Sequence, residues 1–536
     1  MVDLFTPASL SGELSKLCAA FELNATNIIA TGDSEVCQSP EDLKDLLKQN
    51  FLQIQTRLAQ VLNERHNSCT AIGRLSDELI VEILRYVVND WTARNVHNHQ
   101  RPEVSPFLVC RKWRTAAMNE RLLWNKMRIP ASLARFATLR DRNKNAPLEI
   151  CLNYNDFGSE GPGMMGDHLR QLVPRISYLD ISWHEESWEC DPTMANFFAT
   201  YIGQQEFSCL KSLRVDDLNC GAEPPFVLNT PVLQQLMFYG RPLGMPNYMT
   251  SLVNLEWEWF NLTAAEILDV LSGFPQLRTC VISSEMPEFH GDEVDPHFPV
   301  QLKYLESLTV ETLFAHEMSH LLEHLETPSH TVFDLVIEKT LESNDVLERF
   351  FHDRLALSDG LTISPGDKGF LYAFTLPSQG SLRIPVKIEF DGPRGSDARQ
   401  LYSLPNLASY LPNLSLIDLR ISHLPSTLDL MQALRSSPCL IEVRVTTDTY
   451  DFERLLTALE NTPDILCPLL QILDCRGTKF SSILMSQFLG FRQEKGVPIQ
   501  ELKISTGFAN AGTADLIPRV PKLHEYVCNR EDIQSV

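Results

Sequence analysis

Residues 252–282 read LVNLEWEWFNLTAAEILDVLSGFPQLRTCVI. The stretch opens with an apolar-x-x-apolar-x-apolar pattern, formed by Leu252, Leu255 and Trp257. The same pattern returns near its end, where LRTCVI occupies residues 277–282. Between the two copies, LTAAEILDVLSGF has apolar residues at steps of three and four, which is typical of an amphipathic helix. The stretch therefore predicts a strand, a helix and a second strand.

This pattern recurs over most of the chain. Nine further copies are Ile176/Leu179/Ile181, Leu210/Leu213/Val215, Leu233/Leu236/Phe238, Leu305/Leu308/Val310, Val332/Leu335/Ile337, Leu414/Ile417/Leu419, Leu440/Val443/Val445, Leu470/Leu473/Cys475 and Ile499/Leu502/Ile504. STLDLMQALRSS and DFERLLTALENT lie between later copies and read as helices. Strand–helix units repeating at roughly 20–29 residues are typical of leucine-rich repeats, which bury a continuous core by stacking. We expect an irregular leucine-rich-repeat-like domain over residues 145–536.

The repeat fades between residues 353 and 413. GLTIS and IPVKIEF predict two further strands there, and the content of Gly, Pro and Ser favours a long loop. The fold class expected for the chain is an α/β repeat solenoid of divergent leucine-rich repeats, with the shape of a horseshoe, preceded by helical segments.

Residues 1–70 form a polar leader with one strong helical pattern at about residues 40–65. Ser39 and Pro40 are suited to its start. Its apolar stripe consists of Leu43, Leu47, Phe51, Ile54, Leu58, Val61 and Leu62. We favour a helix packed on its own chain over a coiled-coil dimer, because barely three heptads are available.

Residues 71–130 predict two helices separated by a polar insert. In IGRLSDELIVEILRYVV, Ser76 can cap a helix whose first turn holds two acidic residues. The insert at residues 89–104 has the composition of a loop, and the second helix begins at Ser105 and Pro106. Leu123 and Trp124 follow and can close a small core.

Residues 72–129 resemble an F-box. The resemblance is carried by the segments IGRLSDELIVEIL at 72–84, VCRKWR at 109–114 and the pair Leu123-Trp124. Two features depart from the family: Ser76 stands in the place of the usual proline, and the insert lengthens the motif. The leader and the divergent repeats make the likeness strongest to F-box proteins of basidiomycete-like fungi.

This resemblance implies a non-catalytic substrate-recognition subunit of a cullin-type (SCF) ubiquitin ligase. The motif would bind the Skp-type adaptor, and through it a cullin, while the repeats bind a client protein. The implied adaptor-binding residues, in the core or at the interface, are Leu75, Leu79, Ile83, Leu84, Val109, Cys110, Trp113, Leu123 and Trp124. The alternatives are a helical hairpin packed only on the repeats, and a leucine-rich-repeat scaffold without a ligase role.

A competing motif is His316-Glu317-Met318-Ser319-His320, the H-E-x-x-H pattern of zinc metalloproteases. In those enzymes, two histidines on one helix bind zinc and the glutamate is the general base. The third ligand could be His324, Glu338 or Glu342. We favour a structural interpretation, because the segment falls where the repeat requires its helix. No catalytic residue, metal or cofactor is therefore expected.

The composition restricts the class of partner. The chain has 536 residues and a formal net charge of −23, which disfavours general binding to nucleic acid and slightly favours a basic client. No apolar run is long enough to span a bilayer, and no secretory signal is apparent. The 13 cysteines contain no C-x-x-C pair and indicate a reducing compartment, the cytoplasm, the nucleus or both.

Overall fold

The structure is a computed structural model of the chain. It describes scattered residues between 12 and 26, then residues 40–94, 110–129, 140–153, 163–183, 194–203, 205–217, 228–240, 251–284, 298–338, 350–352, 355–366, 369–376, 383–391, 404–460, 465–510 and 512–527. Two compact units are present. The first comprises residues 1–127 and 131–146, and the second comprises residues 128–130 and 147–536.

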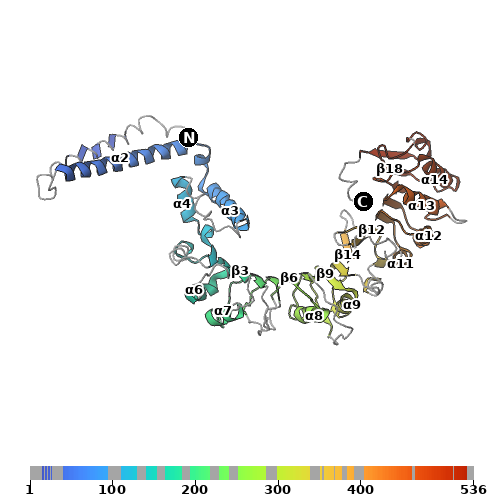
Figure 1. Ribbon diagram of the computed structural model, residues 1–536, viewed down its shortest axis with the longest axis horizontal. Helices are drawn as coiled ribbons and strands as arrows, with labels where there is room; N and C mark the ends of the chain where they lie inside the picture. The colour runs from blue at the N-terminus through green and yellow to red at the C-terminus, as the bar shows by residue number, and fades with distance from the viewer. Residues whose placement is uncertain are drawn as a thin grey trace. The chain divides into compact units, whose positions relative to one another are not determined.

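The first unit is built from helices. They include α2 (Pro40–Cys69), η1 (Ile72–Arg74), α3 (Asp77–Arg94), α4 (Arg111–Asn119) and η4 (Arg121–Trp124) (Figure 1). The helix predicted at residues 40–65 is confirmed and extends to Cys69. Phe51 and Leu62 of its apolar stripe are exposed. The expected packing of this stripe on the chain itself is therefore not found at these two positions.

Two predictions about the helices of this unit were wrong. The insert was expected to be a loop from residue 89, but α3 continues to Arg94 because no glycine or proline interrupts the helix before that point. The second helix was expected to start at Ser105, yet Cys110 has an extended backbone and α4 begins at Arg111. Residues 95–109, including Val109, lie outside the described residues.

The second unit contains a mostly parallel sheet with helices, and the first strand of this sheet begins within the first unit, at Lys126. Its strands are β1 (Lys126–Ile129), β2 (Leu148–Asn153), β3 (Ile176–Trp183), β4 (Ser212–Asp217), β5 (Gln235–Tyr239), β6 (Asn254–Trp259), β7 (Thr279–Ser284), β9 (Ser307–Phe314), β11 (Val332–Glu338), β12 (Gly360–Pro365), β13 (Gly369–Leu376), β14 (Arg383–Asp391), β15 (Leu416–Arg420), β16 (Glu442–Thr446), β17 (Ile472–Asp474), β18 (Glu501–Ser505) and β19 (Lys522–Tyr526). All eleven copies of the repeated pattern coincide with strands of this sheet. The α/β repeat character predicted from the sequence is therefore confirmed.

Strands β2 to β7, then β9 and β11, pair in chain order and in parallel. The order then changes, because β14 pairs with β11 and β12 pairs with β15, both in parallel. Strand β13 lies antiparallel between β12 and β14. From β15 to β19 the strands again pair in chain order. The two strands predicted from GLTIS and IPVKIEF are confirmed, whereas the long loop expected beside them contains β13.

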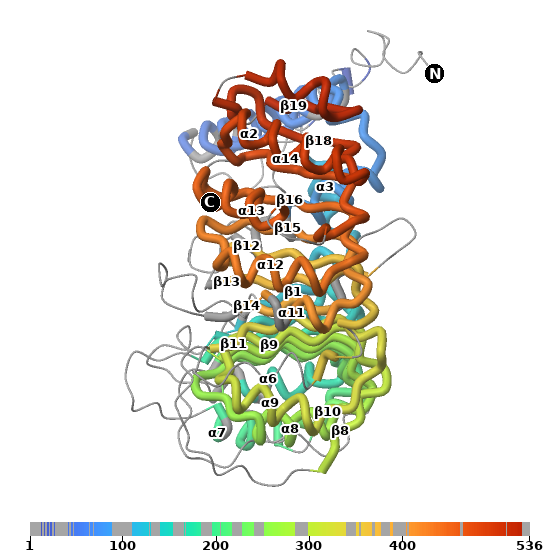
Figure 2. The backbone as a smooth tube through the Cα atoms, turned by 90° about the vertical axis from the view of Figure 1, so that its right-hand side faces the viewer, coloured from blue at the N-terminus to red at the C-terminus, as the bar shows by residue number. Residues whose placement is uncertain are grey.

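The helices α6 (Gly163–Leu172), α7 (Met194–Tyr201), α8 (Ala264–Ser272), α9 (Ala315–Glu323), α11 (Leu404–Ser409), α12 (Thr427–Arg435), α13 (Thr449–Glu460) and α14 (Ser482–Glu494) line one side of the sheet (Figures 1 and 2). Two-residue strands β8 (Val300–Gln301) and β10 (Leu325–Glu326) form a separate parallel pair. Strand side chains alternate between a buried apolar side under the helices and an opposite side, which we call the open face.

Local capping explains where several of these helices begin. Thr263 and Glu266 form a reciprocal capping box at the start of α8. The hydroxyls of Ser426 and Ser481 accept backbone N–H hydrogen bonds at the starts of α12 and α14. The predicted helices in LTAAEILDVLSGF, STLDLMQALRSS and DFERLLTALENT correspond to α8, α12 and α13.

Gly166 is required by the close packing of α6 on α7. A Cβ atom at this position would lie 2.1 Å from Cγ of Tyr201 and 2.7 Å from its Cβ. In an exposed helix, Gly→Ala is stabilising by about 1 kcal/mol. Here we expect Gly166→Ala to be destabilising by about 1–3 kcal/mol, because Cβ and Cγ of Tyr201 would have to move to make room for the new methyl group. Thermal unfolding would measure this, and a stabilised variant would contradict the packing.

Candidate functional site: an exposed apolar face on α3

Helix α3 presents large apolar side chains to solvent. Leu79, Ile83 and Tyr86 are 54%, 39% and 76% exposed. Their steps of four and three residues place them on one side of the helix. Exposed apolar residues scattered singly are ordinary, but a contiguous group on one helix indicates a surface for a partner. We call these three residues the apolar face of α3.

A second strip of the same helix forms the core of the unit. Ile80 and Leu84 are fully buried and pack with residues of α4 and η4. Because each helical residue turns the chain by about 100°, this strip lies beside the apolar face and does not overlap with it. The rest of the buried cluster consists of Trp113, Ala116, Ala117, Leu123 and Trp124, and Leu75, Val81 and Cys110 pack partly buried against it.

The structure thus divides the site residues predicted from the sequence. Leu79 and Ile83 are exposed, whereas Leu84, Trp113, Leu123 and Trp124 are in the core. Leu75 and Cys110 lie at its edge. The predicted closing role of Leu123 and Trp124 in a small core is confirmed.

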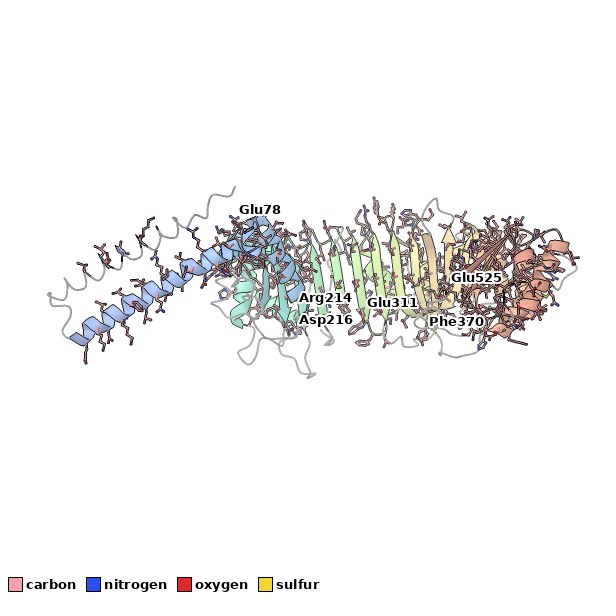
Figure 3. The ribbon with its side chains drawn as sticks, turned by 90° about the horizontal axis from the view of Figure 1, so that it is seen from above. Glu78, Arg214, Asp216, Glu311, Phe370 and Glu525 are labelled. Carbon is pink, nitrogen blue, oxygen red and sulfur yellow. The ribbon has the colours of Figure 1, made fainter. Side chains whose placement is uncertain are left out.

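Polar contacts fix the first turn of α3. The Ser76 hydroxyl accepts a hydrogen bond from the Leu79 backbone N–H at 3.4 Å, so the predicted cap is present. The pKa of Glu78 is lowered, chiefly by a backbone N–H at the helix start and also by the Ser76 hydroxyl. Figure 3 marks Glu78 at this end of the helix.

Other polar contacts hold the helices of the unit together. Lys112 of α4 donates to the carbonyl oxygens of Gly73 and Leu75 in the turn before α3. The Trp124 indole donates to the Ala117 carbonyl at 2.7 Å. Arg85 lies 3.3 Å from a Glu120 carboxylate oxygen. The core residues and these contacts give the apolar face of α3 a fixed support.

Sequence reasoning missed part of this exposed surface. Tyr86, the most exposed member of the apolar face, was not singled out, although it continues the helical spacing of Leu79 and Ile83. Other exposed apolar residues of the unit, outside the apolar face of α3, include Ile72, Met118 and Leu122. Exposure could not be read from these residue types, because the core residues around them are equally apolar.

The H-E-x-x-H motif lies on α9, the helix predicted after Leu308 and Val310. Its glutamate has a structural contact: Glu317 Oε2 accepts a hydrogen bond from the Ala264 backbone N–H at 2.6 Å, at the start of α8. A general base must be within reach of a metal-bound water. A carboxylate that joins two neighbouring helices favours the structural interpretation of the motif.

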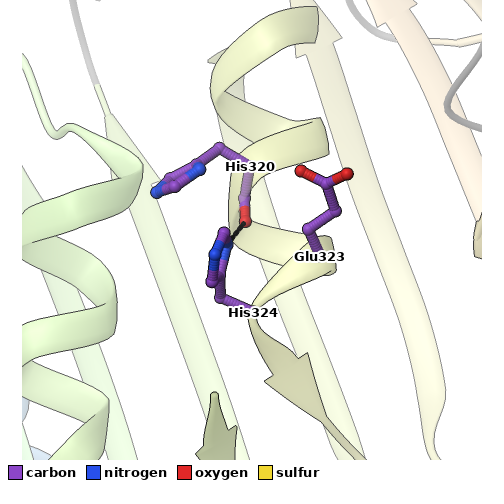
Figure 4. Close-up of side chains that lie close together, drawn as sticks. All are labelled: His320, Glu323 and His324. Carbon is purple, nitrogen blue, oxygen red and sulfur yellow. Dashed lines mark hydrogen bonds between the residues drawn. The ribbon is translucent and has the colours of Figure 1, made fainter. Parts of the chain in front are cut away.

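The group of possible metal ligands near this motif contains only one of its two histidines. Atoms of His320, Glu323 and His324 lie within 4.8 Å of one another, a group that does not include His316. Within it, the His324 ring nitrogen Nδ1 and the carbonyl oxygen of His320 are 3.0 Å apart, as Figure 4 shows. His320 is also buried, and its ring lies 4.4 Å from that of His324. Packing between two turns of one helix accounts for this geometry.

The open face of the sheet is acidic over its first strands. Acidic residues there include Asp180, Asp216, Glu256, Glu258 and Glu311, and Figure 3 marks Asp216 and Glu311. Burial raises the pKa of Asp180, and Arg214 at 4.0 Å opposes this effect. Burial, with Asp180 adding to it, raises the pKa of Tyr178 to about 12.

Neither a family model nor a curated protein matches this chain. Among the helices that the structure describes, none combines the length and the apolar character needed to cross a bilayer.

Proposed function

We propose that this protein is a non-catalytic substrate-recruiting subunit of a cullin-type ubiquitin ligase. In this proposal, the first unit is an F-box that binds the Skp-type adaptor through the apolar face of α3. The second unit is a divergent leucine-rich-repeat horseshoe that binds the client protein. The observation that carries the proposal is the exposure of Leu79, Ile83 and Tyr86 beside a well-packed core.

Two physical arguments support this assignment. A few short helices cannot bury all of their large side chains, so the apolar side chains that remain exposed gain stability when a partner covers them. Exposed leucine, isoleucine and tyrosine side chains on a rigid helix are suited to this, because little conformational entropy is lost on binding. Trp113 and Trp124 are buried in the core next to α3. In this proposal they support the apolar face of α3 from inside the unit.

The test is co-purification of the full chain with a co-expressed Skp-type adaptor. Leu79→Asp combined with Ile83→Asp would place two carboxylates in the proposed interface. We expect at least a hundredfold loss of adaptor affinity, because each desolvated, unpaired charge costs about 2 kcal/mol or more. Undiminished recovery of the adaptor would overturn the proposal.

The matched control is Leu428→Asp combined with Ile483→Asp. Leu428 and Ile483 are exposed leucine and isoleucine residues on α12 and α14 of the second unit. This variant has the same composition and net charge as the first, and we expect it to retain the adaptor. Circular dichroism of both variants checks that they fold.

A further inference from the structure

The last strands of the sheet carry a repeated acid-x-base sequence on the open face. It occurs once in each of four successive repeats, as Asp418-Leu419-Arg420, Glu442-Val443-Arg444, Asp474-Cys475-Arg476 and Glu501-Leu502-Lys503. In each copy the central residue is buried apolar core. The flanking acid and base therefore point to the opposite side of the sheet, away from the helices.

The strand register arranges these charges in an alternating row. Asp418 pairs with Arg444, which pairs with Asp474, which in turn pairs with Lys503. Opposite charges on neighbouring strands are favourable cross-strand pairs. Within this row each base has an acidic neighbour, so its charges largely compensate one another.

Arg420 and Arg476 extend beyond this row. Each guanidinium donates hydrogen bonds to the aspartate two residues before it. Arg420 Nη2 lies 2.9 Å from Asp418 Oδ2, and Arg476 Nη2 lies 2.6 Å from Asp474 Oδ2. The Nε atoms of both arginines also donate to the same carboxylates. These bidentate contacts fix the guanidinium planes in place.

The acids and bases of these two pairs differ in exposure. The aspartate side chains are only 5% and 3% exposed, whereas those of Arg420 and Arg476 are 56% and 46% exposed. The guanidinium groups are therefore exposed to solvent, whereas the carboxylates that compensate their charge are buried below them. Among the residues that the structure describes, no group accepts a hydrogen bond from Nη1 of either arginine.

A groove connects the two arginines. It has a volume of about 500 Å³. Besides the paired aspartates Asp418 and Asp474, its lining includes Arg420, Arg444, Arg476, Thr446, Pro365 and Tyr526. The Tyr526 ring lies 4.8 Å from Cζ of Arg476, which further holds that guanidinium in position. The groove thus offers positioned cationic donors beside hydroxyl and apolar groups.

We propose that this groove binds an acidic, extended peptide segment of a partner protein. The chain has a net charge of −23, so an outward-facing group of arginines is a local exception to its charge. A short carboxylate-bearing segment interacts with the local donors, whereas a long polyanion would also meet the surrounding negative charge. This surface lies in the second unit, and the proposal does not depend on adaptor binding.

The spacing of the arginines defines the segment. Arg420 is the last residue of β15 and Arg476 lies just after β17, which is two places away in the sheet, a separation of roughly 10 Å. A peptide in the extended polyproline II conformation covers this distance in three residues at ~3.1 Å per residue, and its side chains three residues apart lie on the same side. The preferred segment therefore carries carboxylates at positions i and i+3.

The probe is a fluorescein-labelled peptide containing Glu-Val-Thr-Glu, with a Gln-Val-Thr-Gln peptide as its neutral counterpart. Binding to the full chain is followed by fluorescence anisotropy at low and high salt. We expect the acidic peptide to bind at least about tenfold more tightly than the neutral one, with an affinity that falls as salt rises. Equal binding of the two peptides would overturn the proposal.

The decisive variant replaces both pairs at once: Asp418→Asn, Arg420→Gln, Asp474→Asn and Arg476→Gln. It leaves the net charge at −23 and leaves no unpaired carboxylate beneath the groove. We expect at least a tenfold loss of affinity for the acidic peptide. Retained affinity would disprove the site.

Two control variants test whether peptide binding depends on this groove alone. Arg435→Gln with Lys495→Gln removes two exposed basic residues near the ends of helices α12 and α14, and should bind as the wild type does. The double variant Leu79→Asp, Ile83→Asp should also bind the peptide normally, which separates this proposal from the adaptor proposal. A single-stranded DNA oligonucleotide that binds more tightly than the acidic peptide would overturn the choice of a peptide.

Discussion

Leu84→Ala is expected to lower the free energy of unfolding of the first unit by about 2–5 kcal/mol, the usual cost of removing a buried leucine side chain. Leu84 is fully buried among Trp113, Leu123 and Trp124. Its loss leaves a cavity between α3, α4 and η4. A small unit has a stability of only several kcal/mol, so this change should unfold a large fraction of it.

Leu79→Ala is the matched control, because it makes the same substitution five residues earlier on the same helix. Leu79 is 54% exposed, so we expect a change of no more than about 0.5 kcal/mol. Hydrogen-exchange mass spectrometry of peptides from α3 and α4 would measure both variants in the full chain. Equal protection in the two variants would contradict the assignment of one leucine to the core and the other to the surface.

Arg492→Met is expected to destabilise the last repeats by at least about 3 kcal/mol. Arg492 lies on α14 and is fully buried. Its guanidinium donates to four backbone carbonyl oxygens, those of Leu466, Cys467, Leu470 and Val497. Methionine fills a similar volume but removes these four hydrogen bonds. The Cys467 oxygen keeps the Leu470 N–H as a donor, and each buried oxygen left without a donor costs about 1–3 kcal/mol. Burial lowers the pKa of Arg492, yet the group remains a cation.

The control for Arg492 is Arg435→Met. Arg435 occupies the last turn of α12, as Arg492 does in α14, but it is exposed. We expect its replacement to change stability by no more than about 0.5 kcal/mol. Exchange protection in β17 and β18 is the measurement, and an Arg492→Met variant with normal protection would show that the carbonyl contacts contribute little.

Much of the fold was predictable because strands and helices have different periods in the sequence. The eleven copies of the repeated pattern specify strands, since alternate residues must meet the same buried side of the sheet. Strand β13 was missed because it interrupts this repeat: it is antiparallel to both of its neighbours in the sheet. The extension of α3 to Arg94 was missed because polar residues suit an exposed helix as well as a loop.

The groove at Arg420 and Arg476 had a signal in the sequence that we did not use. The acid-x-base pattern recurs in four successive repeats, and its acid and base are two residues apart, so that both face the same side of the strand. The sequence could not show which member of each pair faces solvent. That depends on the depth of each position in the sheet and on the register of the neighbouring strands.

The opening stretch, residues 252–282, illustrates the division between sequence and structure. By itself the sequence determined that this stretch forms strand, helix and strand, because hydrophobic periodicity is a local property of the chain. Only the tertiary structure decided that Glu317, 53 residues beyond Ala264, caps helix α8. In the same way, it decided that Leu84 is buried while Leu79 is exposed. Burial depends on what packs against a residue, and these neighbours come from segments distant in the sequence.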